Sequence, residues 1–215
     1  MNALWKELLI RFGNLKTKFP KTKLGRRVLV SKRVVNSIPY RRYFKNYECI
    51  RIAEPIDLRG DADCVSFGDG AYIGHHTVIE VWKKYSKDRN PRLVVGGNAC
   101  IGEYNHITCV NCIQIGENLL TGRWVTISDN NHGDNSWEQM HQAPASRPVT
   151  SKGPVIIGDN VWLGEKVTVV SGVTIGDGSV IAANSVVTKD IPAFCVAGGC
   201  PAVVIKQQCE IVNQK

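Results

Sequence analysis

Five histidines are the candidates for proton transfer near neutral pH: His75, His76, His106, His132 and His141. His132 differs from the others because it lies at the start of a long segment, residues 129–154, that carries no hydrophobic repeat. Long loops anchored on regular structure are commonly functional. A histidine side chain changes charge near neutral pH, so His132 would serve as a general base towards a hydroxyl group. A solvated surface histidine is the competing interpretation.

A general base of this kind needs a second group to orient its ring. Two carboxylates flank the histidine, Asp129 and Asp134. Either carboxylate, or a backbone carbonyl, would satisfy the second ring nitrogen. The sequence leaves these three alternatives open.

The cysteines favour neither a metal site nor a disulfide scaffold. Eight of them are spread over 215 residues, and Cys109-x-x-Cys112 is the one C-x-x-C pair. A zinc site of this type needs a second pair of ligands at matching spacing. Charged residues also interrupt the N-terminal apolar run, which argues against a secretory signal. We therefore expect reduced thiols, no required metal and a cytoplasmic protein.

Charge divides the chain into two parts. The net charge is +8, but residues 1–50 hold 13 basic and 2 acidic residues, leaving 14 basic and 17 acidic residues in the remainder. The sequence thus predicts a basic N-terminal segment, residues 1–48, ahead of a slightly acidic body. No DNA- or RNA-binding motif accompanies the positive charge, so a nucleic-acid partner is not expected.

A six-residue repeat identifies the element that must position His132. From residue 157 an aliphatic residue recurs at every sixth position: Ile157, Leu163, Val169, Ile175, Ile181 and Val187. This spacing does not fit the 3.6-residue period of an α-helix. The chain also has 25 Val and 19 Ile against 11 Leu, a ratio typical of β-structure.

Short strands joined by tight turns satisfy this repeat, with three hexapeptides forming one triangular coil of about eighteen residues. We predict such a coil over residues 49–192, followed by a C-terminal cap or tail over residues 193–215. Two segments without the repeat, residues 80–92 and 129–154, are predicted to be loops leaving the coil. An ordinary β-sandwich with accidental spacing is the disfavoured alternative, because sandwich strands do not keep a strict six-residue count.

Three runs of residues carry a resemblance to a known family. They are Ile156-Ile-Gly-Asp-Asn-Val-Trp-Leu-Gly164, Val186-Val-Thr-Lys-Asp-Ile-Pro192 and Val196-Ala-Gly-Gly-Cys-Pro-Ala202. With the repeat, they resemble the hexapeptide-repeat acyltransferases, in particular the galactoside, maltose and polysaccharide-biosynthesis O-acetyltransferases. The resemblance implies a mainly β protein: a left-handed parallel β-helix with a basic, partly helical N-terminal segment and a short C-terminal cap.

The resemblance also implies an activity. Enzymes of this family transfer acetyl from acetyl-CoA to a hydroxyl group of a sugar or polysaccharide precursor, directly and without an acyl-enzyme. His132 occupies the family's catalytic histidine position. The backbone N–H of Glu165 matches the oxyanion donor, and Trp162 lies near the acetyl group. Covering a corner of the coil is the alternative role for Trp162.

Substrate-binding residues follow from the same resemblance. Four positions match family contacts to coenzyme A: Ala183, Thr188, Lys189 and Lys206. The last would meet the nucleotide phosphates, although a neighbouring basic family position is Val203 here. Asn105 matches an asparagine that binds the acceptor sugar. Ordinary turn residues are the alternative for Thr188, Lys189 and Asn105.

Partners and location are predicted with two interpretations open for the N-terminus. The resemblance implies a homotrimer with sites between the β-helices of adjacent protomers. Residues 1–19 place apolar side chains at helical spacing beside Lys and Arg. Residues 1–45 would therefore either pack on the protein or rest on the inner face of an anionic membrane. The rival functions are a xenobiotic (antibiotic) acetyltransferase and a catalytically silent β-helix scaffold.

Overall fold

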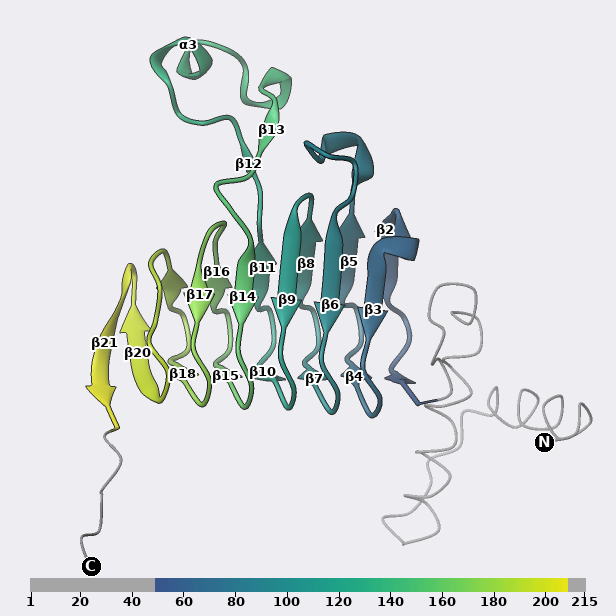
Figure 1. The fold of residues 1–215 in the computed structure, drawn as a ribbon, viewed down its shortest axis with the longest axis vertical. Coiled ribbons are helices and arrows are strands. Elements are labelled where there is room, and N and C mark those ends of the chain that lie inside the picture. Colours follow the sequence, from purple (N-terminus) through teal and green to yellow (C-terminus); the bar gives the residue numbers. More distant parts are fainter. Residues whose placement is uncertain (1–48, 209–215) are drawn as a thin grey trace, which may run out of the picture.

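The computed structural model describes residues 49–208, which wind into a β-helix (Figure 1). Each turn contributes one short strand to each of three sheets, A, B and C. Sheet A contains β1 (Arg51–Ile52), β4 (Tyr72–Ile73), β7 (Cys100–Ile101), β10 (Leu120–Thr121), β15 (Trp162–Leu163), β18 (Val180–Ile181), β20 (Cys195–Gly199) and β21 (Ala202–Gln207). Sheet B contains β2 (Asp57–Gly60), β5 (Val78–Val81), β8 (His106–Cys109), β11 (Thr126–Ser128), β16 (Thr168–Val169) and β19 (Val186–Val187). Sheet C contains β3 (Val65–Phe67), β6 (Arg92–Val95), β9 (Cys112–Ile115), β14 (Val155–Ile157) and β17 (Thr174–Ile175).

The strands of successive coils pair in parallel and in register. Leu163 pairs with Ile181 in sheet A, and Val169 pairs with Val187 in sheet B. In these uninterrupted coils each strand position therefore lies beside the position eighteen residues further along the chain. The coil predicted from the six-residue repeat, and the left-handed parallel β-helix that the family resemblance implies, are confirmed.

The repeated aliphatic residues form the core. All six repeat positions from residue 157 to residue 187 are buried, as are the corresponding residues of earlier coils. Their neighbours on each strand point outwards. β-Branched side chains suit these strands because they pack well on a pleated surface. Burying each large aliphatic side chain stabilises the fold by about 1.5–3 kcal/mol. Every turn of the β-helix contributes such residues, so the core runs along its full length.

Glycine permits the close stacking of coils where sheet A turns into sheet B. A Cβ atom on Gly102 would lie 2.3 Å from the carbonyl oxygen of Gly122, and one on Gly122 would lie 2.6 Å from the nitrogen of Glu165. No side chain fits in these spaces. The coils can therefore stack this closely at the corner only because Gly follows the inward-facing residue of each of these sheet A strands.

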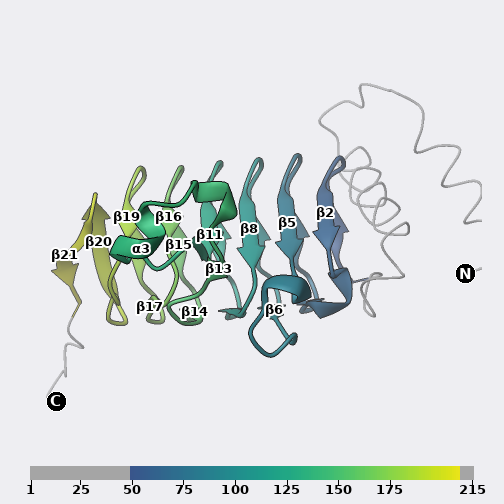
Figure 2. The same ribbon diagram turned by 90° about the horizontal axis from the view of Figure 1, so that it is seen from above.

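Two insertions leave the coil at one corner, where sheet B turns into sheet C; we call it the B–C corner. Residues 82–91 lie between β5 and β6, and residues 129–154 lie between β11 and β14. Figures 1 and 2 show both on the same side of the coil. The longer insertion contains β12 (Asn131–His132), α3 (Trp137–Met140) and β13 (Val149–Thr150).

Asp129 anchors the longer insertion to the coils on either side. Its buried carboxylate accepts hydrogen bonds from the backbone N–H groups of Val110 and Asn111, both at 2.8 Å. Its carbonyl oxygen accepts a 2.8 Å bond from the hydroxyl of Ser171, which in turn accepts the N–H of Lys152. Both ends of the insertion are thus tied to the rigid coil.

The coil continues beyond residue 192 before it closes. β20 pairs in parallel with β18, and β21 then turns back to pair antiparallel with β20. The predictions for residues 1–48, including membrane contact and the amphipathic helix, lie outside the described residues. Across residues 49–208, the structure contains no helix that is long and apolar enough to cross a bilayer.

Candidate active site

His132 is exposed on a two-stranded ribbon that rises from the B–C corner. The ribbon consists of β12 and β13, in which His132 pairs with Val149. The N–H of Gly133 donates to the carbonyl of Pro148 at 2.9 Å, and the hydroxyl of Thr150 donates to the carbonyl of Gly133 at 3.0 Å. These bonds hold the backbone of the predicted base while leaving its ring open to solvent.

Neither candidate carboxylate orients the His132 ring. Asp129 accepts backbone N–H groups inside the coil, and Asp134 accepts the N–H of Ser136 at 2.9 Å. Within residues 49–208, the His132 ring makes no hydrogen bond to a carboxylate or to a backbone carbonyl. The orienting group therefore comes neither from Asp129 nor from Asp134 in this structure.

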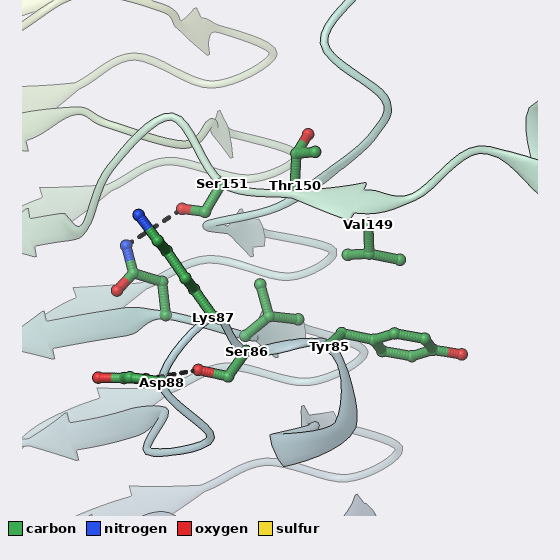
Figure 3. A pocket seen from close by; sticks show the side chains of 9 residues that line it. Tyr85, Ser86, Lys87, Asp88, Val149, Thr150 and Ser151 are labelled. Atoms are coloured by element: carbon green, nitrogen blue, oxygen red, sulfur yellow. Dashed lines mark hydrogen bonds between the residues drawn. The ribbon is translucent and has the colours of Figure 1, made fainter. Parts of the chain in front are cut away.

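A pocket lies beside the ribbon, between the two insertions of the B–C corner (Figure 3). Its volume is about 440 Å³, within the usual range of ligand sites. Figure 3 shows Val149 pointing towards Tyr85, while Lys87 reaches towards Ser151 at the other end. The sequence predicted both insertions as loops, but it gave no signal that their side chains enclose one cavity.

Trp162 lies on the outer surface of sheet A, with 51% of its surface exposed. It is the first residue of β15 and pairs with Leu120 on one side and Val180 on the other. The next inward residue, Leu163, is fully buried. Trp162 therefore presents about half of its surface to solvent on the outer face of sheet A.

Glu165 lies at the corner where sheet A turns into sheet B, which we call the A–B corner. Its side chain is exposed, and its N–H donates to no acceptor among residues 49–208. The N–H of Arg123, at the same corner one coil earlier, is equally unpaired within those residues. A free N–H therefore suits an oxyanion donor without singling out Glu165.

An outward row of residues crosses sheet A from Trp162 towards the C-terminal end. Trp162 pairs with Val180, Val180 pairs with Val196, and Val196 pairs with Lys206 on β21. Paired residues share one face of a sheet. This row, which we call the sheet A row, is therefore an apolar strip that ends at an exposed cation.

The remaining residues predicted to bind coenzyme A divide between two corners. Ala183 is exposed at the A–B corner, one coil after Glu165, and the N–H of Asn184 donates to the carbonyl of Glu165 at 2.8 Å. Thr188 and Lys189 are exposed at the B–C corner, directly after β19. All three side chains are accessible, but a single protomer does not bring them together.

Asn105 is buried, and both ends of its side-chain amide are engaged inside the coil. Its oxygen accepts the N–H of Val125 at 2.7 Å, and its nitrogen donates to the hydroxyl of Thr121. This arrangement matches the turn asparagine that was the alternative interpretation. With 2% of its surface exposed, Asn105 is engaged inside the coil, and its contact with the acceptor sugar stays a prediction.

The predicted base and the predicted acetyl-group contacts lie at different corners. His132 rises from the B–C corner, whereas Trp162 and Glu165 belong to sheet A and the A–B corner. Figure 1 shows β12 above the coil and the β15 label on the opposite, lower side. One protomer alone therefore supplies two separate halves of the predicted site.

The C-x-x-C pair is not arranged as a reactive thiol or metal centre. Cys109 is fully buried, and burial raises the pKa of its thiol above the ordinary value. Its sulfur instead donates to the carbonyl of Arg92 at 3.4 Å. Within residues 49–208 no group of three or more His, Cys, Asp or Glu side chains is placed to hold a metal ion.

A stack of aromatic rings follows the A–B corner and was missed from the sequence. His76 stacks on Tyr104 with ring centres 4.8 Å apart, and Tyr104 stacks on Trp124 at 5.4 Å. The ammonium of Lys166 lies 5.9 Å from the Trp124 ring centre. One-coil spacing of aromatic residues is the signal that would have predicted the stack. Its ring faces cover one another, so it stabilises the corner.

Comparisons with known proteins agree with this architecture. Residues 154–189 match a family described as hexapeptide repeat of succinyl-transferase. The Escherichia coli K12 protein WbbJ, named as a lipopolysaccharide biosynthesis O-acetyl transferase, is 32% identical over 170 residues, covering 78% of this chain and 82% of WbbJ. The galactoside O-acetyltransferase of the same organism is 42% identical over 95 residues, which are 44% of each chain.

Two solved structures share the fold at lower identity. A hexapeptide-repeat acetyltransferase of Vibrio cholerae, complexed with acetyl coenzyme A, has a TM-score of 0.50 and 21% identity, covering 97% of this chain and 91% of that one. AntD, an N-acyltransferase of Bacillus cereus, has a TM-score of 0.51 and 17% identity, covering 77% and 83% of the two chains. Together with the identity to WbbJ over most of both chains, the coil assigns this protein to the hexapeptide-repeat O-acetyltransferase family.

Proposed function

We propose that this enzyme transfers an acetyl group from acetyl-CoA to a hydroxyl group of a saccharide, with His132 as the general base. The observation that carries the proposal is the position of His132. It is an exposed imidazole on a hydrogen-bonded ribbon at the start of the anchored insertion. The similarity to WbbJ and to the galactoside O-acetyltransferase supports acetyl as the acyl group and a saccharide as the acceptor.

The sheet A row has the chemistry that coenzyme A requires. Its apolar strip suits the pantetheine arm, and Lys206 at its end suits a phosphate group. From Trp162 to Lys206 the row spans three strand spacings, or roughly 14 Å. Acetyl-CoA bound along the row would place its thioester near Trp162 and Glu165 and its nucleotide near Lys206. Ala183 would then line the same side of the coil.

The proposed reaction needs one proton transfer in each direction. His132 takes the proton of the acceptor hydroxyl as its oxygen attacks the thioester carbonyl. The carbonyl oxygen becomes an oxyanion, which the N–H of Glu165 stabilises. When the carbon–sulfur bond breaks, the thiolate of coenzyme A leaves with the proton held by His132. No acyl-enzyme forms, so the side chain of Glu165 has no direct part.

Because the two halves of the site lie at different corners, we propose that each active site forms between two protomers. The B–C corner of one protomer would bring His132, Thr188 and Lys189 to the sheet A row of the neighbouring protomer. Three protomers packed around one axis satisfy every such contact, because each protomer supplies its B–C corner to one neighbour and its sheet A row to the other. The proposed assembly is a homotrimer.

The function is tested by incubating purified protein with acetyl-CoA and a panel of saccharides. Release of the free thiol of coenzyme A follows the reaction, and mass spectrometry identifies an acetylated sugar. We expect a product about 42 mass units heavier than the acceptor saccharide, because an acetyl group replaces one hydrogen atom. The product should form only when the saccharide is present. Binding of coenzyme A without any acetylated product would contradict the proposal and favour a scaffold.

Lys206→Glu is expected to weaken binding of coenzyme A about tenfold or more, because it replaces a phosphate-binding cation by an anion. The KM for acetyl-CoA should rise while kcat changes little, since Lys206 lies far from the thioester. Calorimetry gives the dissociation constant, and Lys152→Glu, an exposed lysine at the B–C corner, is the matched control. An equal loss in both variants would remove Lys206 from the site.

The composite site makes two expectations about assembly. Light scattering should give about three times the 23.7 kDa mass of one chain. Co-expressed His132→Ala and Trp162→Ala chains should be more active together than either is alone, because mixed trimers restore some intact sites. A fully active monomer would refute the trimer, and equal activity of mixed and separate chains would refute the shared site.

A further inference from the structure

We propose that the pocket between the two insertions of the B–C corner binds the acceptor as a neutral sugar ring, with Asp88 and Lys87 hydrogen-bonding its neighbouring hydroxyl groups. This inference deepens the proposed function and rests on it. It names the place in the chain where the acceptor binds and the class of sugar that fits there. Neither the repeat nor the comparisons assign this pocket.

The pocket lies on the same face of the ribbon as His132. Val149 lines the pocket and is the direct partner of His132 across β12 and β13. Gly133 and Pro148 form the next cross-strand pair along the ribbon, and the N–H of Gly133 donates to the carbonyl of Pro148. His132 and Val149 therefore form a non-hydrogen-bonded pair, the type whose side chains lie closest on one face. A molecule touching Val149 in the pocket is within reach of the His132 ring.

The polar end of the pocket has hydrogen-bonding capacity left over. One oxygen of Asp88 accepts the hydroxyl of Ser86 at 2.9 Å and the N–H of Asn90 at 3.0 Å. The other oxygen, and the ammonium of Lys87, have no partner within residues 49–208. A free carboxylate oxygen accepts hydroxyl protons, and an ammonium donates to hydroxyl or ring oxygens. Adjacent hydroxyl groups of a sugar supply both partners.

The opposite end of the pocket is apolar and fixed in place. Tyr85 and Val149 face each other there, as Figure 3 shows, and the buried Val110 also lines the pocket. The Tyr85 ring is held by an edge contact with Trp82 at 6.4 Å between ring centres and by the ammonium of Lys84 at 4.5 Å. The C–H surface of a sugar ring suits such a wall, while its hydroxyl groups suit the polar end.

The charges favour a neutral sugar over a phosphate or a sugar acid. The Asn90 N–H and the Ser86 hydroxyl stabilise the Asp88 carboxylate and hold its pKa below the usual range, so it stays ionised at neutral pH. An anionic ligand would meet this charge at the same end where it meets Lys87. Arg92 also acts on the Asp88 carboxylate but lines no part of the pocket. An anion in the pocket would therefore meet one lining cation, Lys87, and one lining anion, Asp88, whereas hydroxyl groups pair with both side chains.

The test measures sugar binding separately from acetyl transfer. Saturation-transfer NMR without acetyl-CoA is recorded with methyl glucoside, methyl galactoside and methyl N-acetylglucosaminide, and with glucuronic acid as the anionic probe. Asp88→Asn and Lys87→Met are the pocket variants. Glu138→Gln on α3 and Lys152→Met are matched controls, since both are exposed at the same corner and line no part of the pocket. We expect about tenfold weaker sugar binding in the pocket variants only.

Each outcome separates this inference from the proposed function. Weaker binding in the pocket variants supports the pocket even if no acetylated sugar forms, a result that would end the proposed function alone. Acetyl transfer with an unchanged acceptor KM in both pocket variants would overturn the pocket and keep the function. The inference also fails if glucuronic acid binds more tightly than the neutral glycosides, or if none of the neutral glycosides binds.

Discussion

His132→Ala is expected to lower the rate of acetyl transfer by a factor of about 10²–10⁴, the usual effect of removing a general base. A sugar hydroxyl is a weak nucleophile while it keeps its proton. Without an imidazole at this position, only water remains to accept that proton. Because the side chain of His132 is exposed and makes no hydrogen bond within residues 49–208, its loss should not disturb the fold.

The measurement is release of coenzyme A thiol at saturating acetyl-CoA and saccharide, together with the dissociation constant of coenzyme A by calorimetry. The rate should fall while the dissociation constant stays the same. His141→Ala is the matched control, since His141 lies on the same insertion and its ring contacts Trp137 instead. A His132→Ala enzyme as active as the His141→Ala enzyme would eliminate the proposed base.

The second large effect concerns stability. Asp129→Ala should lower the free energy of unfolding by about 3 kcal/mol or more, because it leaves the N–H groups of Val110 and Asn111 without an acceptor at the base of the insertion. The buried N–H of Val110 left unpaired costs about 1–3 kcal/mol, and the part-buried N–H of Asn111 adds a smaller cost. The alanine also leaves a gap where a fully buried carboxylate stood.

Urea unfolding followed by circular dichroism gives this free energy. Asp134→Ala is the control, because Asp134 is exposed on the same insertion and should change stability by about 0.5 kcal/mol or less. Asp129→Asn should fall between the two, since its amide oxygen still accepts one of the two N–H groups. If Asp129→Ala were no less stable than Asp134→Ala, the anchoring role of this carboxylate would be wrong.

The core of the coil was predictable because it depends only on spacing. A residue such as Leu163 or Val169 is buried by its place in a six-residue count, and the count is visible in one sequence. The start of the longer insertion was predictable for the same reason, since the count stops there. His132 could therefore be placed on a loop that a rigid strand positions, before its surroundings were known.

The surroundings themselves depend on contacts between coils, which leave no local pattern. Asp129 was a candidate to orient His132, yet its carboxylate serves N–H groups nineteen and eighteen residues earlier in the chain. Asn105 was assigned to the sugar by its match, yet its amide serves the backbone twenty residues later. Both are polar residues at turns, and sequence alone does not distinguish a turn that faces a ligand from one that supports the next coil.

The pocket was hidden for a different reason. Lys87 and Asp88 are ordinary polar residues of a loop, and nothing near them in the chain points to His132. They meet the ribbon only because residues 82–91 and 129–154 leave the same corner two coils apart. That juxtaposition follows from the number of strands between the two loops, and the sequence of either loop alone does not reveal it.

The shared corner has a consequence for how such an enzyme diversifies. Lengthening a flexible loop costs little, about 0.6 kcal/mol for each doubling of its length, and a residue added at the corner does not shift any strand pairing. Apart from the anchoring Asp129 and the proposed base His132, residues 82–91 and 129–154 are therefore free to vary in length and composition while the coil is inherited unchanged. New acceptor specificities would then arise by exchange of these two segments between relatives, without compensating changes in the core.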